Sequence, residues 1–513
     1  MTVTEQSPVT RGAVDRSRVV AVVGTGTMGR GIAQVALAAG HPVRLYDAVP
    51  GRAARAADDI GARLDRLVHK GRMDAAERDA AHARLRPEDD LARLGDAALV
   101  VEAVVEQLAA KQELFAALEA IVEDDCLLAT NTSSLSVTAV AGPLKRPGRV
   151  VGLHFFNPAP LLPLVEVVSG FATDEESATR AWATAAAWGK TPVRCADLPG
   201  FIVNRVARPF YAESFAIHEE RGADPATLDA VLRECGGFPM GPFELTDLIG
   251  QDVNEAVTRS VWDSFFHDVK FTPSLAQRRL VEAGLLGRKT GRGWYDYGEG
   301  ADRPEPVTAP PADAPAQVTA QGDPGPAAQL LDMIAEAGIP VTREDAYMGT
   351  RLVLPGGGHL ELTLGAPTAG RDLVYFDLSP DYRAATRIAL APAPYGAERT
   401  LQEATGLFQA LGKKVSVIED VPGMIVARTV AMLIDIAAEA VAKGVATEDD
   451  IDTAMRLGVN HPLGPLEWNR RLPVGWAHIL LENLHQCVPG GRYAPGLALR
   501  RRYDAGEGEG DVS

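Results

Sequence analysis

The sequence predicts an α/β domain with a doubly wound parallel sheet, then an all-α domain, a degenerate α/β segment and a second copy of the all-α domain. Three observations predict this organisation. A glycine-rich turn connects an apolar run to a helix near the start of the chain. Apolar runs then alternate with helical patterns as far as residue 198. The helical segment that follows recurs later in the chain at a constant offset of 223 residues.

The glycine-rich turn, GTGTMG, begins at residue 24, directly after the apolar run 18–23, and has the pattern G-x-G-x-x-G. A helix is predicted over 30–39, and a strand over 42–46 ends at Asp47, 18 residues after the last glycine. Such glycines let the backbone approach a pyrophosphate, and the helix N-terminus offers that anion N–H groups and a positive dipole end. The alternative is a turn that serves only the close packing of helix and strand.

We expect this turn to bind a dinucleotide through Gly24, Gly26, Thr27, Met28, Gly29 and Asp47. The Asp47 carboxylate would accept hydrogen bonds from ribose hydroxyls and repel a 2′-phosphate, which predicts NAD rather than NADP. The resulting NAD-binding, Rossmann-like domain is predicted over residues 17–198.

Further strands are predicted over 99–104, 126–131 and 150–155, and residues 50–95 have a helical pattern. In a doubly wound sheet, ligands bind beyond the carboxyl ends of the strands. The residues at or past those ends are Gly24, Glu106, Ser133 and His154. His154 is therefore expected on the rim where a nicotinamide would lie.

Residues 153–168, LHFFNPAPLLPLVEVV, contain one histidine, His154, and one carboxylate, Glu166, and are otherwise apolar except for Asn157. A buried carboxylate is costly unless it is paired. An imidazole partner would gain a fixed tautomer and a more basic second ring nitrogen. The alternative is a histidine at a strand end and a glutamate at a strand edge that do not interact.

A second group of charged residues lies in the helical stretch after Asp47. Arg63, Arg66 and Lys70 are spaced i, i+3 and i+7, so they share one helix face. That face would suit the phosphates of a large anionic substrate. On spacing alone, the alternative of a solvated stripe interleaved with aspartates is favoured.

Composition narrows the function classes. The 513-residue chain has a net charge of −17, with 46% hydrophobic and 23% charged residues, which is typical of a globular protein of about three domains. The acidic balance argues against a nucleic-acid partner. No apolar run approaches the roughly 18 residues of a membrane span, and the first 17 residues contain no apolar signal segment. The four cysteines are far apart, so we expect no disulfide framework, no metal site and a cytoplasmic location.

The repeat is clearest where PGFIVNR at 199–205 recurs as PGMIVAR at 422–428. It predicts a helical domain over 199–298, a Pro/Ala-rich linker over 299–327, a degenerate α/β segment over 328–410 and a second helical domain over 411–505. At the same offset, His154 corresponds to Asp377, Glu166 to Ala389 and Asn204 to Ala427. We therefore expect one active site per chain.

Together these motifs resemble those of the bacterial 3-hydroxyacyl-CoA dehydrogenases, in the form with a duplicated C-terminal domain. The resemblance rests on GTGTMGRGIA, VVEAVVE, ATNTSSL, GLHFFNPAP with LVEVV, DLPGFIVNR, PMGPFEL and GRKTGRGWYDY. It is strong over residues 17–298, clear over 411–475 and weak over 328–410.

The resemblance implies roles for individual residues. His154 and Glu166 would form the catalytic dyad, and Ser133 and Asn204 would contact the substrate. NAD contacts are implied for Asp47, Glu106, Lys111, Asn157 and Lys289. Lys70 matches a lysine that holds coenzyme A in the family, and Arg63 lies on the same helix face. The resemblance therefore gives phosphate binding by this face the same weight as the alternative of a solvated stripe.

The implied reaction is NAD-dependent oxidation of an (S)-3-hydroxyacyl-CoA to the 3-ketoacyl-CoA, without a metal, with His154 as the general base. The acyl group is expected to be short, as in 3-hydroxybutyryl-CoA, or to be 3-hydroxyadipyl. The alternatives are a dehydrogenase of free hydroxy or sugar acids on a related fold, and a non-catalytic NAD-binding protein. The expected partner is the acyl-CoA, with no nucleic acid or membrane. The second helical copy predicts a pseudo-dimer within the chain or a homodimer.

Overall fold

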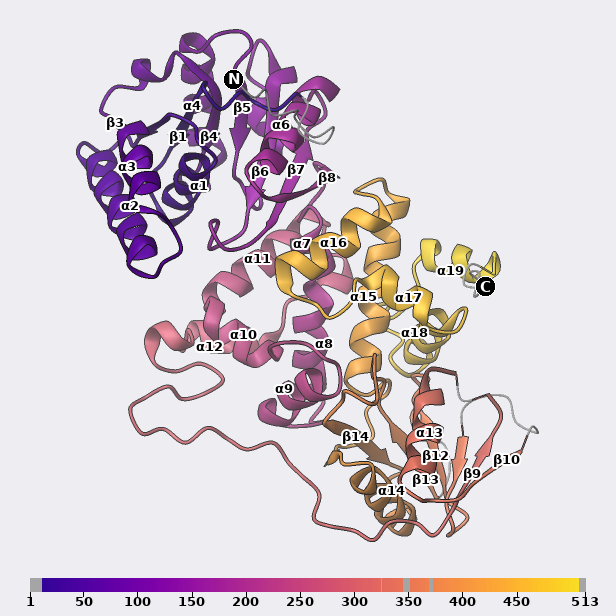
Figure 1. Cartoon of the computed structure of the whole chain (residues 1–513). Helices are drawn as coiled ribbons and strands as arrows, with labels where there is room; N and C mark the ends of the chain where they lie inside the picture. Colours follow the sequence, from indigo (N-terminus) through magenta and orange to yellow (C-terminus); the bar gives the residue numbers. More distant parts are fainter. Residues whose placement is uncertain (1–11, 324, 345–350, 369–371, 507–513) are drawn as a thin grey trace, which may run out of the picture. The chain divides into compact units, whose positions relative to one another are not determined.

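The computed structural model describes residues 12–323, 325–344, 351–368 and 372–506 and divides into two compact units (Figure 1). The first unit comprises residues 1–203 together with 444–458, and the second comprises residues 204–443 together with 459–513. The predicted NAD-binding domain thus lies in the first unit, and most of the repeated helical part lies in the second.

The first unit is built on a sheet with the strand order β3-β2-β1-β4-β5-β6-β7-β8. Neighbouring strands run parallel, except that β6 and β7 run antiparallel. The strands are β1 (Val19–Val23), β2 (Val43–Tyr46), β3 (Leu85–Glu88), β4 (Ala97–Glu102), β5 (Leu127–Thr130), β6 (Val150–Phe155), β7 (Leu164–Ser169) and β8 (Thr191–Ala196). The order proceeds outward from β1 in both directions, so the predicted doubly wound sheet is confirmed.

Helices connect these strands, and α6 packs beside β6, β7 and β8 (Figure 1). They are α1 (Thr27–Ala38), α2 (Arg52–His69), α3 (Ala75–Arg84), α4 (Leu108–Ile121), α5 (Val137–Ala141) and α6 (Glu175–Ala187), with short 3₁₀ turns η2 (Leu91–Leu94) and η3 (Pro147–Arg149). The prediction of helix throughout 50–95 is wrong at β3. Only Leu85 of β3 is buried, and Pro87 is tolerated because β3 lies at the edge of the sheet and pairs with β2 alone. Such an edge strand carries little of the apolar signal that identifies central strands.

The second unit begins with the first helical copy. Its helices are α7 (Val203–Val206), which starts at the last residue of the first unit, α8 (Arg208–Glu219), α9 (Pro225–Glu234), α10 (Pro242–Ile249), α11 (Gln251–Ser264) and α12 (Leu275–Glu282), with 3₁₀ turns η4 (Val269–Phe271) and η5 (Arg288–Thr290). Proline at the first turn of α8, α9 and α10 suits positions whose N–H has no partner within the helix. No helix in the described part of the chain is both long and apolar enough to cross a membrane.

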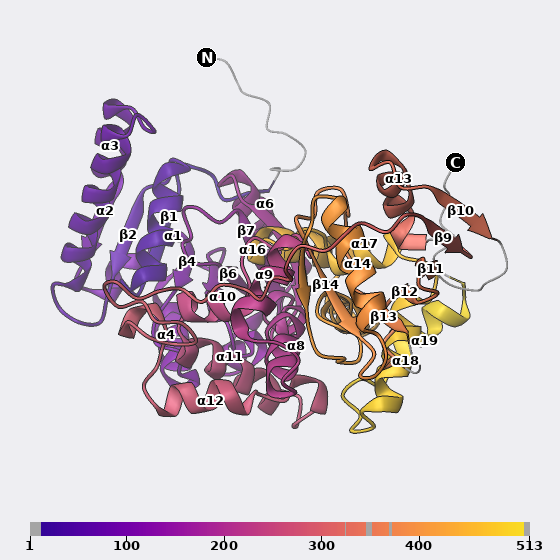
Figure 2. The same cartoon turned by 90° about the horizontal axis from the view of Figure 1, so that it is seen from below.

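A second, mixed sheet follows with the order β10-β9-β11-β12-β13-β14-β15. Its elements are β9 (Val318–Gln321), η6 (Gly325–Ala327), α13 (Ala328–Glu336), β10 (Val341–Glu344), β11 (Arg351–Val353), β12 (His359–Leu362), β13 (Leu373–Phe376), β14 (Arg387–Pro392), α14 (Glu398–Ala410) and β15 (Lys414–Val417). Helix α14 packs across β12 to β15, and α13 lies by β10 (Figure 2). The predicted linker over 299–327 is too long, because β9 is already part of this sheet.

The structure extends the internal repeat upstream of the sequence match. At the constant offset, β7 corresponds to β14 and α6 to α14, with identical bounds, and β6 and β8 correspond to β13 and β15. The strand directions repeat as well: antiparallel between the first two strands and parallel between the last two. Lys190 donates to the Leu162 carbonyl, and its counterpart Lys413 donates to the corresponding Ala385 carbonyl. The segment 328–410 thus keeps the last strands of the first domain without its glycine-rich turn.

The second helical copy contains α15 (Val426–Ala442), α16 (Glu448–Val459), α17 (Pro465–Arg471), α18 (Trp476–Cys487) and α19 (Leu497–Asp504). Residues 444–458, which include most of α16, belong to the first unit. The Ala196 N–H donates to the Val445 carbonyl at 2.7 Å, which continues the hydrogen bonding beyond β8. A Cβ at Gly458 would lie 2.6 Å from the end of the Leu164 side chain, so a larger residue there would require that side chain to move.

Equivalent elements of the two copies pack on each other within the second unit. Helix α8 packs on α15, and Phe238 meets its counterpart His461 with ring centroids 5.0 Å apart. Phe210 contacts both rings, at 4.9 and 5.5 Å. A contact between equivalent residues is what a two-fold dimer forms between subunits, and here it forms within one chain.

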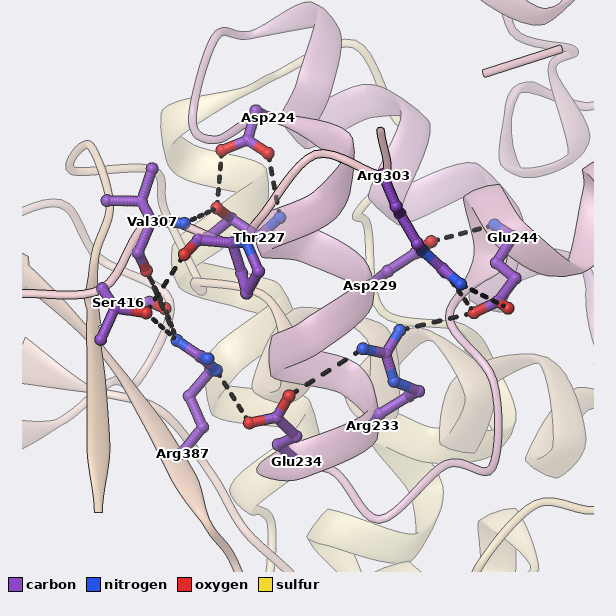
Figure 3. A network of polar contacts seen from close by, with 12 residues as sticks. Asp224, Thr227, Asp229, Arg233, Glu234, Glu244, Arg303, Val307, Arg387 and Ser416 are labelled. Atoms are coloured by element: carbon purple, nitrogen blue, oxygen red, sulfur yellow. Dashed lines mark hydrogen bonds and ion pairs between the residues drawn. The ribbon is translucent and has the colours of Figure 1, made fainter. Parts of the chain in front are cut away.

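The linker is held to both neighbouring parts of the second unit (Figure 3). The Val307 N–H donates to Thr227 of α9 at 2.9 Å, and the Val307 carbonyl accepts from Ser416 of β15 at 2.7 Å. Arg387 of β14 donates to Ser416 at 2.7 Å and forms an ion pair with Glu234 of α9 at 3.1 Å. The linker therefore fixes the first helical copy to the second sheet.

His461 gives the second unit a pH-dependent stability. Complete burial lowers the pKa of His461 to about 3, so the native state keeps it neutral. The unfolded chain, with a pKa near 6.5, binds a proton that the native state excludes, so stability falls as pH drops from about 6.5 towards 3. At pH 5 this amounts to about 2 kcal/mol relative to neutral pH.

We expect His461→Phe to remove this contribution, because phenylalanine already occupies the equivalent position 238. Urea unfolding at pH 7.5 and pH 5 measures the effect. The loss of stability between the two pH values is expected to be about 2 kcal/mol smaller in the variant. An identical loss in both proteins would contradict a neutral, buried His461.

Candidate active site

His154 and Glu166 are directly opposite each other on the antiparallel strands β6 and β7. Opposite residues on such strands project to the same face, so strand pairing itself brings the side chains together. Nδ1 of His154 lies 2.5 Å from Oε2 of Glu166, and the two residues are 6% and 0% exposed. The predicted contact is therefore present and buried.

The other oxygen of Glu166 anchors the following helix. Oε1 accepts hydrogen bonds from the backbone N–H groups of Ile202 and Val203, at 3.0 and 2.8 Å, where α7 begins. These two bonds tie the carboxylate to the backbone at the start of α7. A carboxylate accepts only, so a neutral His154 carries its proton on Nδ1 and leaves Nε2 as the nitrogen that can take up a proton.

The second copy retains the helix anchor without the imidazole. Asp377, the counterpart of His154, accepts from the N–H groups of Ile425 and Val426 at 3.0 and 2.8 Å. These are the counterparts of Ile202 and Val203. Ala389 is fully buried at the position of Glu166. In the second copy, the carboxylate that anchors the helix therefore stands at the position of His154 and not at that of Glu166. It still accepts from the helix N–H groups, but it has no imidazole to orient.

Aromatic rings enclose the His154 imidazole. Its ring centroid lies 4.5 Å from that of Phe156 and 5.8 Å from that of Phe201. Phe201 has a positive φ of 48°, after Gly200 at 74°, and the repeat reproduces this turn with Met424 at 52° and Gly423 at 77°. The apolar surroundings limit solvation of a charged imidazolium, which makes the Glu166 carboxylate its main stabilising partner.

Glu106 organises the loop that carries Ser133. Oε1 of Glu106 accepts from the Thr132 hydroxyl at 2.5 Å and from the N–H groups of Ser133 and Ser134 at 3.0 and 3.1 Å. Burial opposes ionisation of Glu106, but these hydrogen bonds and the Lys111 ammonium, 3.2 Å from Oε2, outweigh it and lower its pKa. Glu106 therefore positions the Ser133 loop within the protein.

Two residues that sequence reasoning missed support this region. Glu102, at the end of β4, is fully buried and pairs with Lys111 at 2.5 Å. Asn131 accepts the backbone N–H of Phe155 at 2.9 Å, beside His154. Each is a polar residue at the end of an otherwise apolar strand, and that pattern was the available signal.

The glycine-rich turn has the shape that a pyrophosphate site requires. Gly24 has a φ of +98°, and a Cβ there would lie 2.5 Å from the Ala103 carbonyl oxygen. A Cβ at Gly29 would overlap the Gly24 carbonyl. A Cβ at Gly26, by contrast, would meet no atom within 4 Å, so packing within the protein gives no reason for this glycine. The free space and the uncapped N-terminus of α1, which begins at Thr27, fit a bound dinucleotide.

Asp47 lies beside this turn, directly after β2. Its Oδ2 accepts from the Thr25 N–H at 3.0 Å and from the Thr25 hydroxyl at 2.6 Å, and its Oδ1 accepts from Val49 N–H. Partial burial opposes ionisation, yet these hydrogen bonds lower the pKa of Asp47. The structure thus brings the acid and the glycines together, as predicted, with a negative charge at the end of β2.

The remaining predicted residues lie apart from these groups or in the second unit. Asn157 is exposed in the loop after β6. Lys289 belongs to the second unit, where it pairs with Asp252 at 2.5 Å. Asn204 follows Val203 directly and is the first residue of the second unit.

The basic stripe lies on α2 and at its C-cap, where Lys70 is exposed. Two of the three acids on this helix are engaged by other arginines: Asp59 with Arg30 and Asp65 with Arg78. Among the described residues, Arg63, Arg66 and Lys70 have no carboxylate within ion-pair distance. The stripe is therefore available to an anionic ligand.

The chain matches three family profiles. They are "3-hydroxyacyl-CoA dehydrogenase, NAD binding domain" over residues 19–198, "3-hydroxyacyl-CoA dehydrogenase, C-terminal domain" over 200–297 and 423–511, and "3-hydroxybutyryl-CoA dehydrogenase reduced Rossmann-fold domain" over 362–422. The second profile matches twice, in agreement with the repeat.

Individual proteins are similar to the chain over most of its length. The 3-hydroxyadipyl-CoA dehydrogenase of Escherichia coli K12 is 45% identical over 490 residues, which cover 94% of this chain and 97% of that protein. A probable 3-hydroxybutyryl-CoA dehydrogenase of Bacillus subtilis is 41% identical over 280 residues, 55% of this chain and 97% of that protein. The crystal structure of a 3-hydroxybutyryl-CoA dehydrogenase from E. coli K12 superposes with a TM-score of 0.87 at 42% identity, covering 96% of this chain and 99% of that one.

Proposed function

Because the chain belongs to the 3-hydroxyacyl-CoA dehydrogenase family, we propose that His154 and Glu166 carry out its general-base chemistry on a short or dicarboxylic 3-hydroxyacyl-CoA. The protein is an NAD-dependent oxidoreductase that acts on the CH–OH group of 3-hydroxyacyl-CoA. The observation that carries the residue assignment is the buried contact of 2.5 Å between Nδ1 of His154 and Oε2 of Glu166.

His154 takes the proton of the 3-hydroxyl group on Nε2. Bound NAD would supply the hydride acceptor for C3 of the substrate. Proton removal in step with hydride loss avoids a high-energy cationic carbon and contributes about 10²–10⁴-fold to the rate. Glu166 holds the His154 ring in the required tautomer and stabilises the imidazolium. The second carboxylate oxygen fixes the Glu166 side chain to the backbone at the start of α7.

Ser133 and Asn204 orient the substrate. The Ser133 backbone is held by Glu106, and Asn204 follows the residue whose N–H binds Glu166. The backbone at Ser133 and the backbone just before Asn204 are therefore both held by buried or half-buried carboxylates. We assign to them hydrogen bonds to the hydroxyl or thioester oxygen, which limit the approach of the reacting carbon.

The remaining ligand contacts follow the predicted set. The NAD contacts that we propose are Gly24, Gly26, Thr27, Met28, Gly29, Asp47, Glu106, Lys111, Asn157 and Lys289. Glu106 also holds the Ser133 loop through Oε1, and Lys111 pairs with Oε2 of Glu106. Arg63 and Lys70 bind phosphates of coenzyme A, because these cations have no carboxylate partner among the described residues.

Asp47→Ser is expected to narrow the preference for NAD over NADP. The change removes a carboxylate that binds the ribose hydroxyls and repels a 2′-phosphate. Loss of such a charged hydrogen bond is expected to change the NAD-to-NADP ratio of kcat/KM by about 10- to 100-fold. Steady-state kinetics with both cofactors measure the ratio of kcat/KM values. An unchanged ratio would count against the ribose role.

The function is tested with the full chain in both directions. We expect NADH-dependent reduction of acetoacetyl-CoA, and NAD-dependent oxidation of (S)-3-hydroxybutyryl-CoA and (S)-3-hydroxyadipyl-CoA. The similar E. coli protein and the similar E. coli structure carry names with different acyl groups, so comparing these substrates decides the acyl class. Activity on free hydroxy acids, with none on CoA esters, would overturn the proposal.

We further propose that the chain is a pseudo-dimer with one active site. The support is the packing of α8 on α15 and of Phe238 on His461, together with the loss of the dyad at Asp377 and Ala389. Light scattering in solution tests this: a monomeric mass is expected, and a stable dimer would contradict it.

The four cysteines are free thiols, which supports a reducing, cytoplasmic location.

A further inference from the structure

Arg208, the first residue of α8, is a buried cation without a counter-charge. It is 6% exposed, and among the described residues no carboxylate lies within ion-pair distance of its guanidinium. Nη1 donates to the Thr258 hydroxyl at 3.0 Å, the guanidinium lies over the Tyr211 ring at 5.0 Å, and the buried Nε has no hydrogen-bond partner. The Tyr211 ring therefore gives the positive charge a cation–π contact, but among the described residues no carboxylate neutralises it.

The same helical region shows how a compensated buried arginine is built. Arg428, 1% exposed, is held by Glu213 at 3.0 Å and Glu220 at 2.8 Å. Burial alone would lower its pKa, but these carboxylates raise it. Burial lowers the pKa of Arg208, and only Tyr211 opposes this. An unpaired buried charge is strongly unfavourable, so its retention indicates a ligand that supplies the negative charge.

The neighbouring polar groups orient Arg208 rather than neutralise it. The Thr258 hydroxyl donates a hydrogen bond to the Asn254 backbone carbonyl at 2.9 Å, so its oxygen can accept from Arg208. Asn254 in turn accepts from Gln277 at 3.1 Å. These partners are neutral, so they fix the direction of the guanidinium without removing its charge.

The place of Arg208 in the sequence relates it to the substrate. It follows Asn204 by four residues, and Ala207 between them has helical angles of φ −77° and ψ −8°. Positions i and i+4 share a helix face, about 6 Å apart along the axis. An adipyl chain places its terminal carboxylate three carbons beyond the carbinol carbon, which is a comparable reach.

We infer that Arg208 binds the distal carboxylate of a dicarboxylic 3-hydroxyacyl-CoA, one helical turn beyond Asn204. The inference rests on the proposed function, in which Asn204 contacts the reacting end of the substrate. The planar guanidinium suits a carboxylate because both groups can form two parallel hydrogen bonds. A butyryl chain has no such group and leaves the buried charge unpaired, so Arg208 selects the diacid.

Arg208→Met tests the inference through the ratio of kcat/KM for (S)-3-hydroxyadipyl-CoA to that for (S)-3-hydroxybutyryl-CoA. Loss of a buried, charge-assisted contact is expected to lower this ratio by about 10- to 100-fold. Thr258→Val, which removes only the orienting hydrogen bond, is expected to lower it by a smaller factor. An unchanged ratio in Arg208→Met, or equal losses on both substrates, would overturn the inference. If the parent protein oxidises neither ester, the proposed function itself fails.

Two measurements without turnover separate binding from folding. Without ligand, Arg208→Met is expected to melt no lower than the parent protein, because the change removes an uncompensated buried charge. Saturating adipyl-CoA is expected to raise the melting temperature of the parent more than butyryl-CoA does, and to lose that advantage in the variant. A large fall in the melting temperature of unliganded Arg208→Met would assign Arg208 to the fold and overturn the inference.

Discussion

His154→Gln is expected to lower turnover by about 10²–10⁴-fold while NAD binding is retained. Glutamine can keep a hydrogen bond to Glu166, but it cannot accept the hydroxyl proton. The glycine-rich turn and Asp47 are separate from this change, so the cofactor site stays intact. Stopped-flow or steady-state oxidation of (S)-3-hydroxybutyryl-CoA measures the first effect, and fluorescence titration with NADH measures the second.

Glu166→Gln is the informative companion variant. The amide oxygen is needed by the N–H groups of Ile202 and Val203, so the amide nitrogen must face His154. An amide N–H donates to Nδ1 and thereby places the imidazole proton on Nε2, where the base has to act. Turnover is therefore expected to fall by a similar factor although size and helix anchor are preserved. Near-normal turnover in either variant would end the general-base assignment.

Much of the first domain could be predicted because its signals are local. The strand before Gly24 adjoins the turn, and the acid after β2 follows the last glycine of the turn by only 18 residues. The dyad was harder: His154 and Glu166 meet because β6 and β7 run antiparallel in one register, which spacing alone does not specify. Family resemblance supplied that link, and the register supplies its physical cause.

The parts that could not be predicted depend on tertiary contacts. Glu106 stays a proposed cofactor contact, and the sequence did not indicate that its Oε1 also holds the Ser133 loop, a contact between residues 27 positions apart. β9 was assigned to the linker because the sequence around it is rich in proline and alanine and has few large apolar side chains. The strand itself has only four residues, alternately buried and half-buried, so it carries little apolar signal. The role of Asp377 as a helix anchor is invisible in sequence, because the anchoring carboxylate changed strands between the copies.

Arg428→Met is expected to destabilise the second unit by about 3–5 kcal/mol. Arg428 of α15 pairs with Glu213 and Glu220, and Arg492 approaches Glu213 at 2.7 Å. Glu213 is fully buried, and the two arginines lower its pKa against the effect of burial. Removing Arg428 leaves this carboxylate with half its compensation. Urea unfolding of the full chain at neutral pH measures the change.

Arg205→Met is the matched control, because Arg205 is the counterpart of Arg428 in the first copy. The positions equivalent to Glu213 and Glu220 hold Ile436 and Lys443, and Arg205 instead lies over the Phe265 ring at 4.8 Å. Its loss leaves no carboxylate without an arginine partner, so a much smaller destabilisation is expected. Equal losses of stability in the two variants would contradict this difference between the surroundings of Arg428 and Arg205. A large difference would mean that Glu213 of the first copy depends on Arg428 of the second copy in the same chain. A second chain could then offer Glu213 no better partner than the arginine it already has.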